Sequence, residues 1–287
     1  MGLARRVTRR TRQTNGPGLL FILIALVVVA AAGAQYLGLY APEQPTLAPG
    51  QITSGGGELI PVASKPDETS VQDKGEPVTV LVYHAHGSEN FAPKDSHAKN
   101  GKGEILDVGA EFCQAISEKG IKAIHLKGTY DIPEYSAAFR MAGDAVAKAL
   151  NEYSNVQAVI DIHRDGLPKN KDKDYTTALI SGQRVGKILF VIGDVANPNR
   201  ENNTAFAETA KARLDAMYAG VSRGIKVQHR NLNGSLHDNT LTAYLGDYHG
   251  NNLQEAKASA RLLADVVAAV LLEQARSGMF VVPTTTP

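Results

Sequence analysis

The fold of this chain is decided by residues 78–90, which read VTVLVYHAHGSEN. The first half is an uncharged run of β-branched and aliphatic residues behind Pro77, and it predicts a strand buried on both faces, as in the middle of a parallel sheet. The second half brings His84, His86 and Glu89. Ligands of open α/β sheets bind just past the carboxyl ends of the strands. We therefore expect these three side chains at the functional edge of the sheet.

A second strand ends in the same way. Residues 157–166 read QAVIDIHRDG, a short apolar run that leads into His163 and Arg164. If both strands lie in one parallel sheet, their ends meet at the same edge. Neutral imidazole and carboxylate are ligands of catalytic zinc, which takes three protein groups and leaves one position for water. Two strand-end histidines plus Glu89 meet that number. For each histidine, the alternative is a buried ring bonded to the backbone.

Apolar strands alternate with helical patterns from residue 78 onwards, as in βαβ units. The pattern predicts an α/β fold: a single domain over residues 78–277, with a mostly parallel central sheet flanked by helices. Helices are expected near residues 107–119, 134–153, 200–218 and 253–275. Strands are expected near residues 121–125, 157–163, 187–193, 222–229 and 241–245. The short tail, residues 278–287, is expected to be disordered.

The composition excludes several classes of protein. The 287 residues include 30 basic and 29 acidic side chains, so the net charge gives no indication of nucleic-acid binding. The single cysteine, Cys113, forms neither an intrachain disulfide nor a thiolate metal cluster. The chain has no P-loop, no Gly-x-Ser-x-Gly elbow and no dinucleotide fingerprint after a strand.

The amino-terminal part predicts a membrane anchor. Residues 18–40 carry no charge and are long enough to cross a bilayer as a helix. Residues 1–17 contain five arginines and no acid, which favours a cytoplasmic start and an extracytoplasmic remainder. A cleaved signal peptide is the alternative, because residues 30–34 read AAAGA, but the apolar run is longer than a usual signal core. Residues 41–77, rich in Pro, Gly, Ser and Thr, predict a flexible linker.

These motifs resemble the stage II sporulation protein P family, membrane-anchored cell-wall amidases of spore-forming bacteria. The resemblance spans about residues 78–272, with the motifs in the family's order. It is carried by YHAHGSE at 83–89, VG at 108–109, IDIHRD at 160–165, FVIG at 190–193, NPN at 197–199, SRGI at 222–225 and NNLQEA at 251–256.

The resemblance implies a zinc-dependent N-acetylmuramoyl-L-alanine amidase, which cleaves the amide between the lactyl group of the glycan and the stem peptide of peptidoglycan. It also implies a role in engulfment of the forespore, a lytic transglycosylase as partner, and cleavage of stem-peptide cross-links. By resemblance, His163, Glu89 and either His84 or His86 hold the metal.

The implied mechanism needs a zinc ion to activate water and a carboxylate base to carry the proton to the leaving nitrogen. Arg164 would stabilise the oxyanion, or would only hold Asp161 or Asp165 in place.

The chain departs from the family at the general base. The family places a glutamate in an apolar-Glu-apolar-Gly stretch before the last helix, but residues 243–247 read AYLGD here. The glutamate position falls on Tyr244 or Leu245, and the nearest acid is Asp247, to which we assign the base role; His249 is a second substitute. The alternative is a catalytically degenerate homologue that binds peptidoglycan or a partner without cleaving.

Overall fold

Strand β1 (Thr79–Tyr83) forms from the apolar run and is buried along its whole length. The computed structural model describes residues 77–278. The predicted cytoplasmic segment and membrane helix lie outside these residues, as do nearly all of the predicted linker and tail. Among residues 77–278, every helix is too short or too polar to span a bilayer.

The central sheet has the strand order β2-β1-β3-β8-β6-β7. β1 lies between β2 (Lys122–His125) and β3 (Val156–Asp165), parallel to both. β8 (Thr240–Asp247) adds a fourth parallel strand beyond β3. The prediction of a mostly parallel sheet is therefore confirmed.

The other end of the sheet is reversed. β6 (Ile188–Gly193) runs antiparallel to β8, and β7 (Ser222–Gln228) pairs parallel with β6. The amino-terminal ends of β6 and β7 therefore lie at the edge where β1, β3 and β8 end.

The pattern of residues 177–186 predicts no element, but the structure forms a hairpin there. Its strands are β4 (Thr177–Ile180) and β5 (Gln183–Gly186).

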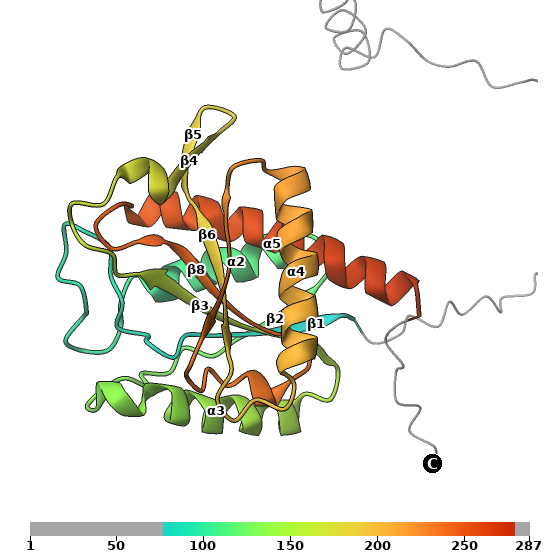
Figure 1. Cartoon of the computed structure of the whole chain (residues 1–287). Helices are drawn as coiled ribbons and strands as arrows, with labels where there is room; N and C mark the ends of the chain where they lie inside the picture. Colours follow the sequence, from blue (N-terminus) through green and yellow to red (C-terminus); the bar gives the residue numbers. More distant parts are fainter. Residues whose placement is uncertain (1–76, 279–287) are drawn as a thin grey trace, which may run out of the picture. The chain divides into compact units, whose positions relative to one another are not determined.

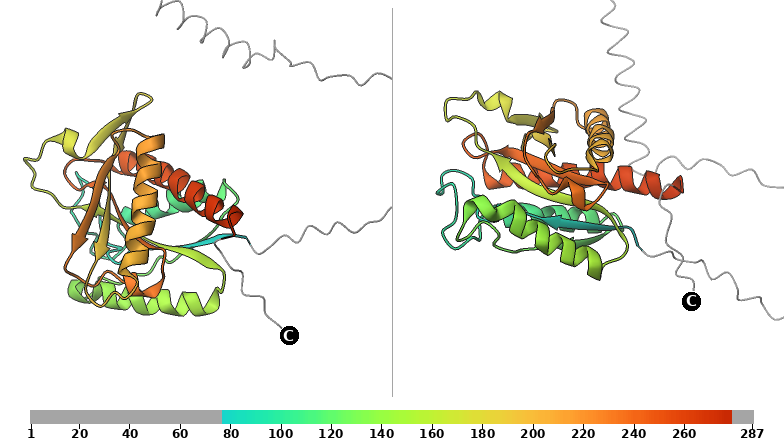
Figure 2. Two further views of the ribbon diagram at one scale, coloured as in Figure 1. Left: turned by 45° about the vertical axis from the view of Figure 1, so that its right-hand side comes forward. Right: turned by 60° about the horizontal axis from the view of Figure 1, so that its bottom comes forward.

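Helices cover both faces of the sheet (Figure 1). α3 (Ala138–Glu152) packs on one face, and α2 (Ile105–Ser117), α4 (Arg200–Met217) and α5 (Leu253–Arg276) pack on the other. The two further views in Figure 2 show the sheet between these layers. Short 3-10 turns occur at η1 (Tyr135–Ala137), η2 (Lys173–Tyr175) and η3 (Gly234–Leu236). The helices flanking the sheet are confirmed as predicted.

Alternation along the strands divides the core into two parts. Val80, Val82, Ile160 and Ile162 pack against the α2 and α5 side. Leu81, Tyr83 and Val159 pack against the α3 side. Successive side chains of a strand point to opposite faces. Asp161 and His163 therefore share the α3 side of the sheet.

Candidate metal centre

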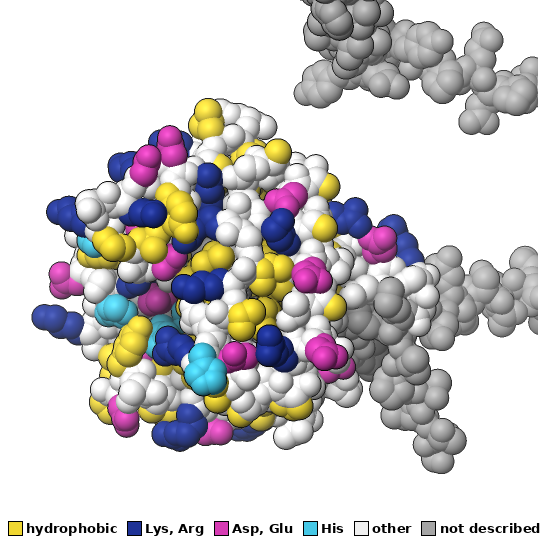
Figure 3. All heavy atoms as spheres, in the orientation of Figure 1, with side chains coloured by type: hydrophobic (Ala, Val, Ile, Leu, Met, Phe, Trp, Pro, Cys, Tyr) yellow, Lys and Arg dark blue, Asp and Glu magenta, His cyan; other side chains and the backbone are white. Residues whose placement is uncertain are grey.

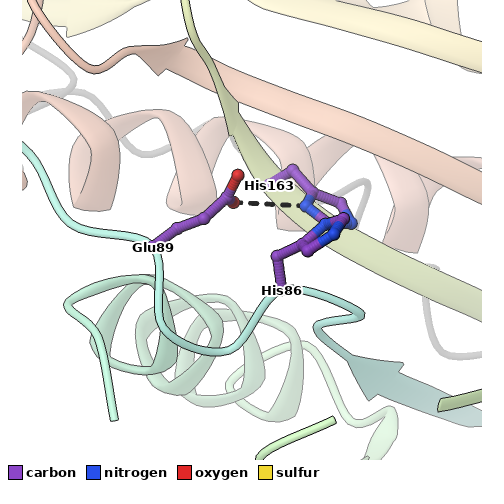
Figure 4. A group of neighbouring side chains, drawn as sticks. All are labelled: His86, Glu89 and His163. Carbon is purple, nitrogen blue, oxygen red and sulfur yellow. Dashed lines mark hydrogen bonds and ion pairs between the residues drawn. The ribbon is translucent and has the colours of Figure 1, made fainter. Parts of the chain in front are cut away.

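His86, Glu89 and His163 form a buried group at the carboxyl edge of the sheet. His86 and Glu89 come from the loop after β1, and His163 comes from β3. One ligand atom of each residue lies within 4.8 Å of the others. Figure 4 shows the side chains of His86 and Glu89 directed towards the ring of His163. This group contains three of the four residues predicted as metal ligands.

The ring of His163 is held between two carboxylates. Its Nδ1 lies 3.2 Å from Oε2 of Glu89, and its Nε2 lies 2.9 Å from Oδ1 of Asp161. The same Asp161 oxygen accepts a hydrogen bond of 3.1 Å from the backbone N–H of Ala85. The strand β3 thus ties His163 to the start of the loop that carries His86 and Glu89.

Burial and charge act in opposite directions on these groups. Burial alone would lower the pKa of His163, but the charges of Asp161 and Glu89 raise it to about 10. Burial would raise the pKa of Glu89, but His163 and the charge of Arg164 lower it to about 2. Burial, together with the charge of His163, lowers the pKa of His86 to about 4. In the metal-free protein at neutral pH, His163 is therefore a protonated, positively charged ring between two anions.

This donor set fits a zinc ion. Two imidazoles and one carboxylate are a ligand set of catalytic zinc sites. A metal-binding histidine usually gives its other ring nitrogen to a carboxylate, which fixes the tautomer. Oδ1 of Asp161 lies beside Nε2 of His163 as an ion pair without hydrogen-bond geometry, and Nδ1 is directed at Glu89. Asp161 also keeps its Oδ2 buried without a hydrogen-bond partner among residues 77–278.

His84 lies on the other face of the sheet, away from this group. Its Nδ1 donates to the backbone oxygen of Ile162 at 2.8 Å, and its Nε2 lies 2.9 Å from Nε2 of His125. A Cβ on Gly109 of α2 would come within 2.3 Å of the His84 ring, so glycine is needed there. Both ring nitrogens of His84 are occupied. Of the two histidines left open by the sequence, the structure brings His86 to Glu89 and His163.

Arg164 is turned towards the loop after β1. Its Nε donates to the backbone oxygen of Asn90 at 3.1 Å, and its Nη2 donates to that of Ser96 at 2.9 Å. Nη1 lies 3.8 Å from Oε1 of Glu89. Arg164 therefore holds Glu89 and its loop, and it contacts Asp165 only through the backbone oxygen.

Asp247 ends β8 and is almost completely buried. Its Oδ1 accepts from the backbone N–H of Leu167 at 2.7 Å. Its Oδ2 accepts from the N–H groups of His249 and Gly250 at 2.9 and 2.8 Å. None of these hydrogen bonds joins Asp247 to the metal group. The carboxylate is therefore used to fix the turn between β8 and α5.

Aromatic rings border the metal group, and the sequence patterns single out Tyr244 but neither Tyr135 nor Phe139. The ring of Tyr135 stacks on His86 with centroids 4.2 Å apart. Phe139 and Tyr244 lie 6.0 and 5.6 Å from His163, centroid to centroid. Tyr244 is the β8 residue in register with His163, so this side chain stands where the family glutamate is expected. Figure 3 shows the visible histidine side chains gathered towards the left of the view, whereas acidic and basic side chains are spread over the whole face.

Asp161 is the ligand-supporting residue that sequence reasoning could have found. It precedes His163 by two residues in a strand, and this spacing places both on one face. Tyr135 has no such signal, because it reaches His86 from a separate turn before α3.

The stage II sporulation protein P family matches residues 50–268 of the chain. The chain belongs to this family. Stage II sporulation protein P of Bacillus subtilis strain 168 is 30% identical over 211 residues, which cover 68% of this chain and 51% of that protein. The chain thus spans about half the length of the curated relative it matches.

Two solved amidase structures are similar to the chain. An N-acetylmuramoyl-L-alanine amidase of Nostoc punctiforme aligns with a TM-score of 0.44 and 15% identity, over 69% of this chain and 97% of the other. The CwlD amidase of Clostridioides difficile, solved in complex with the GerS lipoprotein, aligns with a TM-score of 0.47 and 11% identity, over 70% and 99%. Both alignments are long and both identities are low.

Proposed function

We propose that this member of the stage II sporulation protein P family is a zinc-dependent N-acetylmuramoyl-L-alanine amidase that acts on peptidoglycan. The observation that carries the proposal is the buried group of His86, Glu89 and His163, with Asp161 on the far nitrogen of His163. A single charged residue is seldom buried without a function or a partner. Here two acids and two histidines are concentrated at the ligand-binding edge of the sheet.

The roles of the side chains follow from their contacts. A bound zinc ion would supply Lewis-acid activation of water and of the scissile carbonyl. Asp161 would orient the ring of His163 through its charge beside Nε2. Arg164 fixes Glu89 and the loop after β1 through its hydrogen bonds to Asn90 and Ser96. Tyr135 and Phe139 shield the group from solvent and leave the substrate an apolar wall.

A second candidate function is binding of peptidoglycan without cleavage. The observation that favours it is the state of the carboxylate proposed as general base. Both oxygens of Asp247 accept backbone N–H groups, and Tyr244 occupies the position next to His163. Loss of a general base typically costs a factor of about 10²–10⁴ in rate. An intact metal group with this loss would leave a recognition module.

The cellular setting is proposed from the sequence and from the family. Residues 18–40 would anchor the chain in the cell membrane as a single span, with residues 78–277 outside the cytoplasm and residues 41–77 as the spacer. Peptidoglycan is the substrate in that location. Membership in the family supports a role in sporulation and a lytic transglycosylase as partner.

Digestion of purified peptidoglycan by the zinc-loaded full chain tests the function. Free stem peptides that begin with L-alanine, detected by mass spectrometry and lost on chelation, are the expected products. Intact muropeptides despite bound zinc would reject the amidase and leave the binding module. His163→Ala should abolish cleavage, whereas His229→Ala is the matched control, because the His229 side chain is 90% exposed.

A further inference from the structure

A second charged group lies at the same edge of the sheet as the metal centre. Arg223 is the second residue of β7, and β7 begins at the edge where β3 and β8 end, since Ile188 of β6 pairs with both Ser222 and Leu245. Asp165 ends β3 two residues after His163, which is about 7 Å along an extended strand. Arg223 binds this Asp165, so the two groups are neighbours at one edge.

The guanidinium of Arg223 is buried with part of its hydrogen-bonding capacity unused. Nη2 donates to Oδ2 of Asp165 at 2.8 Å, and the side chain is 6% exposed. Nε and Nη1 are buried and have no partner among residues 77–278. An unpaired buried donor costs free energy, and such donors in native proteins usually meet water or a ligand. Two N–H groups of a cation are therefore available to an acceptor.

The surroundings of Arg223 are cationic and aromatic. The ring of Tyr175 lies 4.7 Å from Cζ of Arg223, and Nζ of Lys171 lies 4.2 Å from the same ring. Asp165 is the acid that faces this group, and its Oδ1 is already used by the backbone N–H of Gly166. Tyr175 is 46% exposed, so the ring beside the guanidinium is itself in contact with solvent.

We propose that Arg223 binds a carboxylate of the stem peptide, so that this cluster is the substrate's acid-binding subsite. The inference rests on the proposed function. A carboxylate and a guanidinium form strong charge-assisted hydrogen bonds. In peptidoglycan the second stem residue is linked through its γ-carboxyl group and leaves its α-carboxylate free. Two extended residues span about 7 Å, which matches the offset of Asp165 from His163 along β3.

Peptide binding tests the subsite without any need for turnover. The probes are the free tripeptide L-Ala-γ-D-Glu-diaminopimelate and its analogue with an α-carboxamide on the second residue. Titration calorimetry on the zinc-loaded full chain should show the acid bound about tenfold or more tightly than the amide. Arg223→Gln should remove this preference, and Arg223→Lys should reduce it, because lysine lacks the planar fork.

Two further variants keep the result interpretable. Arg223→Gln combined with Asp165→Asn removes both charges and avoids a buried unpaired acid, so it separates misfolding from lost recognition. Arg261→Gln is the matched control, since Arg261 pairs with Glu111 and Glu118 on the helical layer. The control should retain the preference for the acid, and the double variant should lose it while unfolding cooperatively.

Three outcomes overturn the proposal. In the first, the parent protein binds acid and amide equally; in the second, the folded double variant retains the preference. In the third, glycerol phosphate binds in an Arg223-dependent way while the peptide does not, which would assign the cluster to a wall phosphate. Failure of the proposed amidase is distinguishable from failure of the subsite. An Arg223-dependent preference for the acid without hydrolysis supports the subsite and rejects the enzyme. Hydrolysis without that preference supports the enzyme and rejects the subsite.

Discussion

Nε2 of His163 lies 2.9 Å from Oδ1 of Asp161, on the side of the ring opposite Glu89. Both residues belong to β3 and are separated by one residue, so the alternation of the strand aligns them. The charge of the carboxylate therefore faces Nε2, while Nδ1 faces Glu89. In the proposed metal site, Asp161 therefore supports His163 from the side of the ring away from Glu89.

Asp161→Asn should weaken zinc binding. Asparagine keeps the shape of the side chain but removes the charge that orients and polarises the ring. Loss of such a supporting group typically costs about 10–100-fold in metal affinity. Competition with a chromogenic chelator measures this directly. Asp144→Asn is the matched control, because the side chain of Asp144 is 77% exposed; an equal loss in both variants would contradict the assignment.

Zinc binding should release one proton near neutral pH. The pKa of His163 is raised to about 10, so the metal-free ring is charged and must lose its proton to bind zinc. Glu89 is already ionised, with a pKa of about 2, and His86 is already neutral, with a pKa of about 4. Apparent affinity should rise about tenfold per pH unit between about pH 7 and 9. Calorimetry in buffers of different ionisation enthalpy counts the proton, and a pH-independent affinity would rule this out.

The metal-free protein should lose stability in alkaline solution. The folded pKa of His163 is raised above its ordinary value of 6.5. The contribution of the protonated ring to the free energy of unfolding is therefore complete below about pH 6.5 and is lost as the pH rises through about 10. Melting temperatures of the chelated protein should fall over this range. His163→Gln, which cannot titrate, should show a flatter profile; identical profiles would remove the ring as the cause.

His84→Ala and His86→Ala should have opposite effects. His84→Ala should leave zinc stoichiometry unchanged. It should lower the free energy of unfolding by about 1–3 kcal/mol, because the two buried hydrogen-bond partners of His84 lose their contact. His86→Ala should abolish tight zinc binding with a smaller loss of stability. Metal analysis and denaturant unfolding of both proteins give the comparison, and loss of zinc in His84→Ala would reverse the assignment.

Asp247→Asn distinguishes a structural acid from a catalytic one. The amide NH₂ would oppose backbone N–H donors that the carboxylate now accepts, so the variant should lose about 1–3 kcal/mol of stability. Its zinc affinity should be unchanged. If Asp247 is instead the general base, kcat should fall by a factor of about 10²–10⁴ while stability is retained.

The sequence alone determined the sheet and the identity of the ligand candidates. The largely apolar runs before His84 and His163 can only be buried by helices on both faces, and parallel strands align their ends. Those two facts place Glu89, His163 and one of the two nearby histidines at one edge. The spacing of Asp161 and His163 is equally local, because a period of two residues puts them on one face of the strand.

Only the tertiary structure decided which side chains meet. Residues 84 and 86 are two apart, so an extended strand would place both on the same face. Two features place them apart: β1 ends at Tyr83, and His84 packs against Gly109 and His125. The backbone N–H groups that bind Asp247 come from Leu167 and from the turn after β8, and no local pattern predicts the first of these. The pairing of Arg223 with Asp165 depends on β6 and β7 running opposite to β8, and strand direction is set by how the whole chain packs.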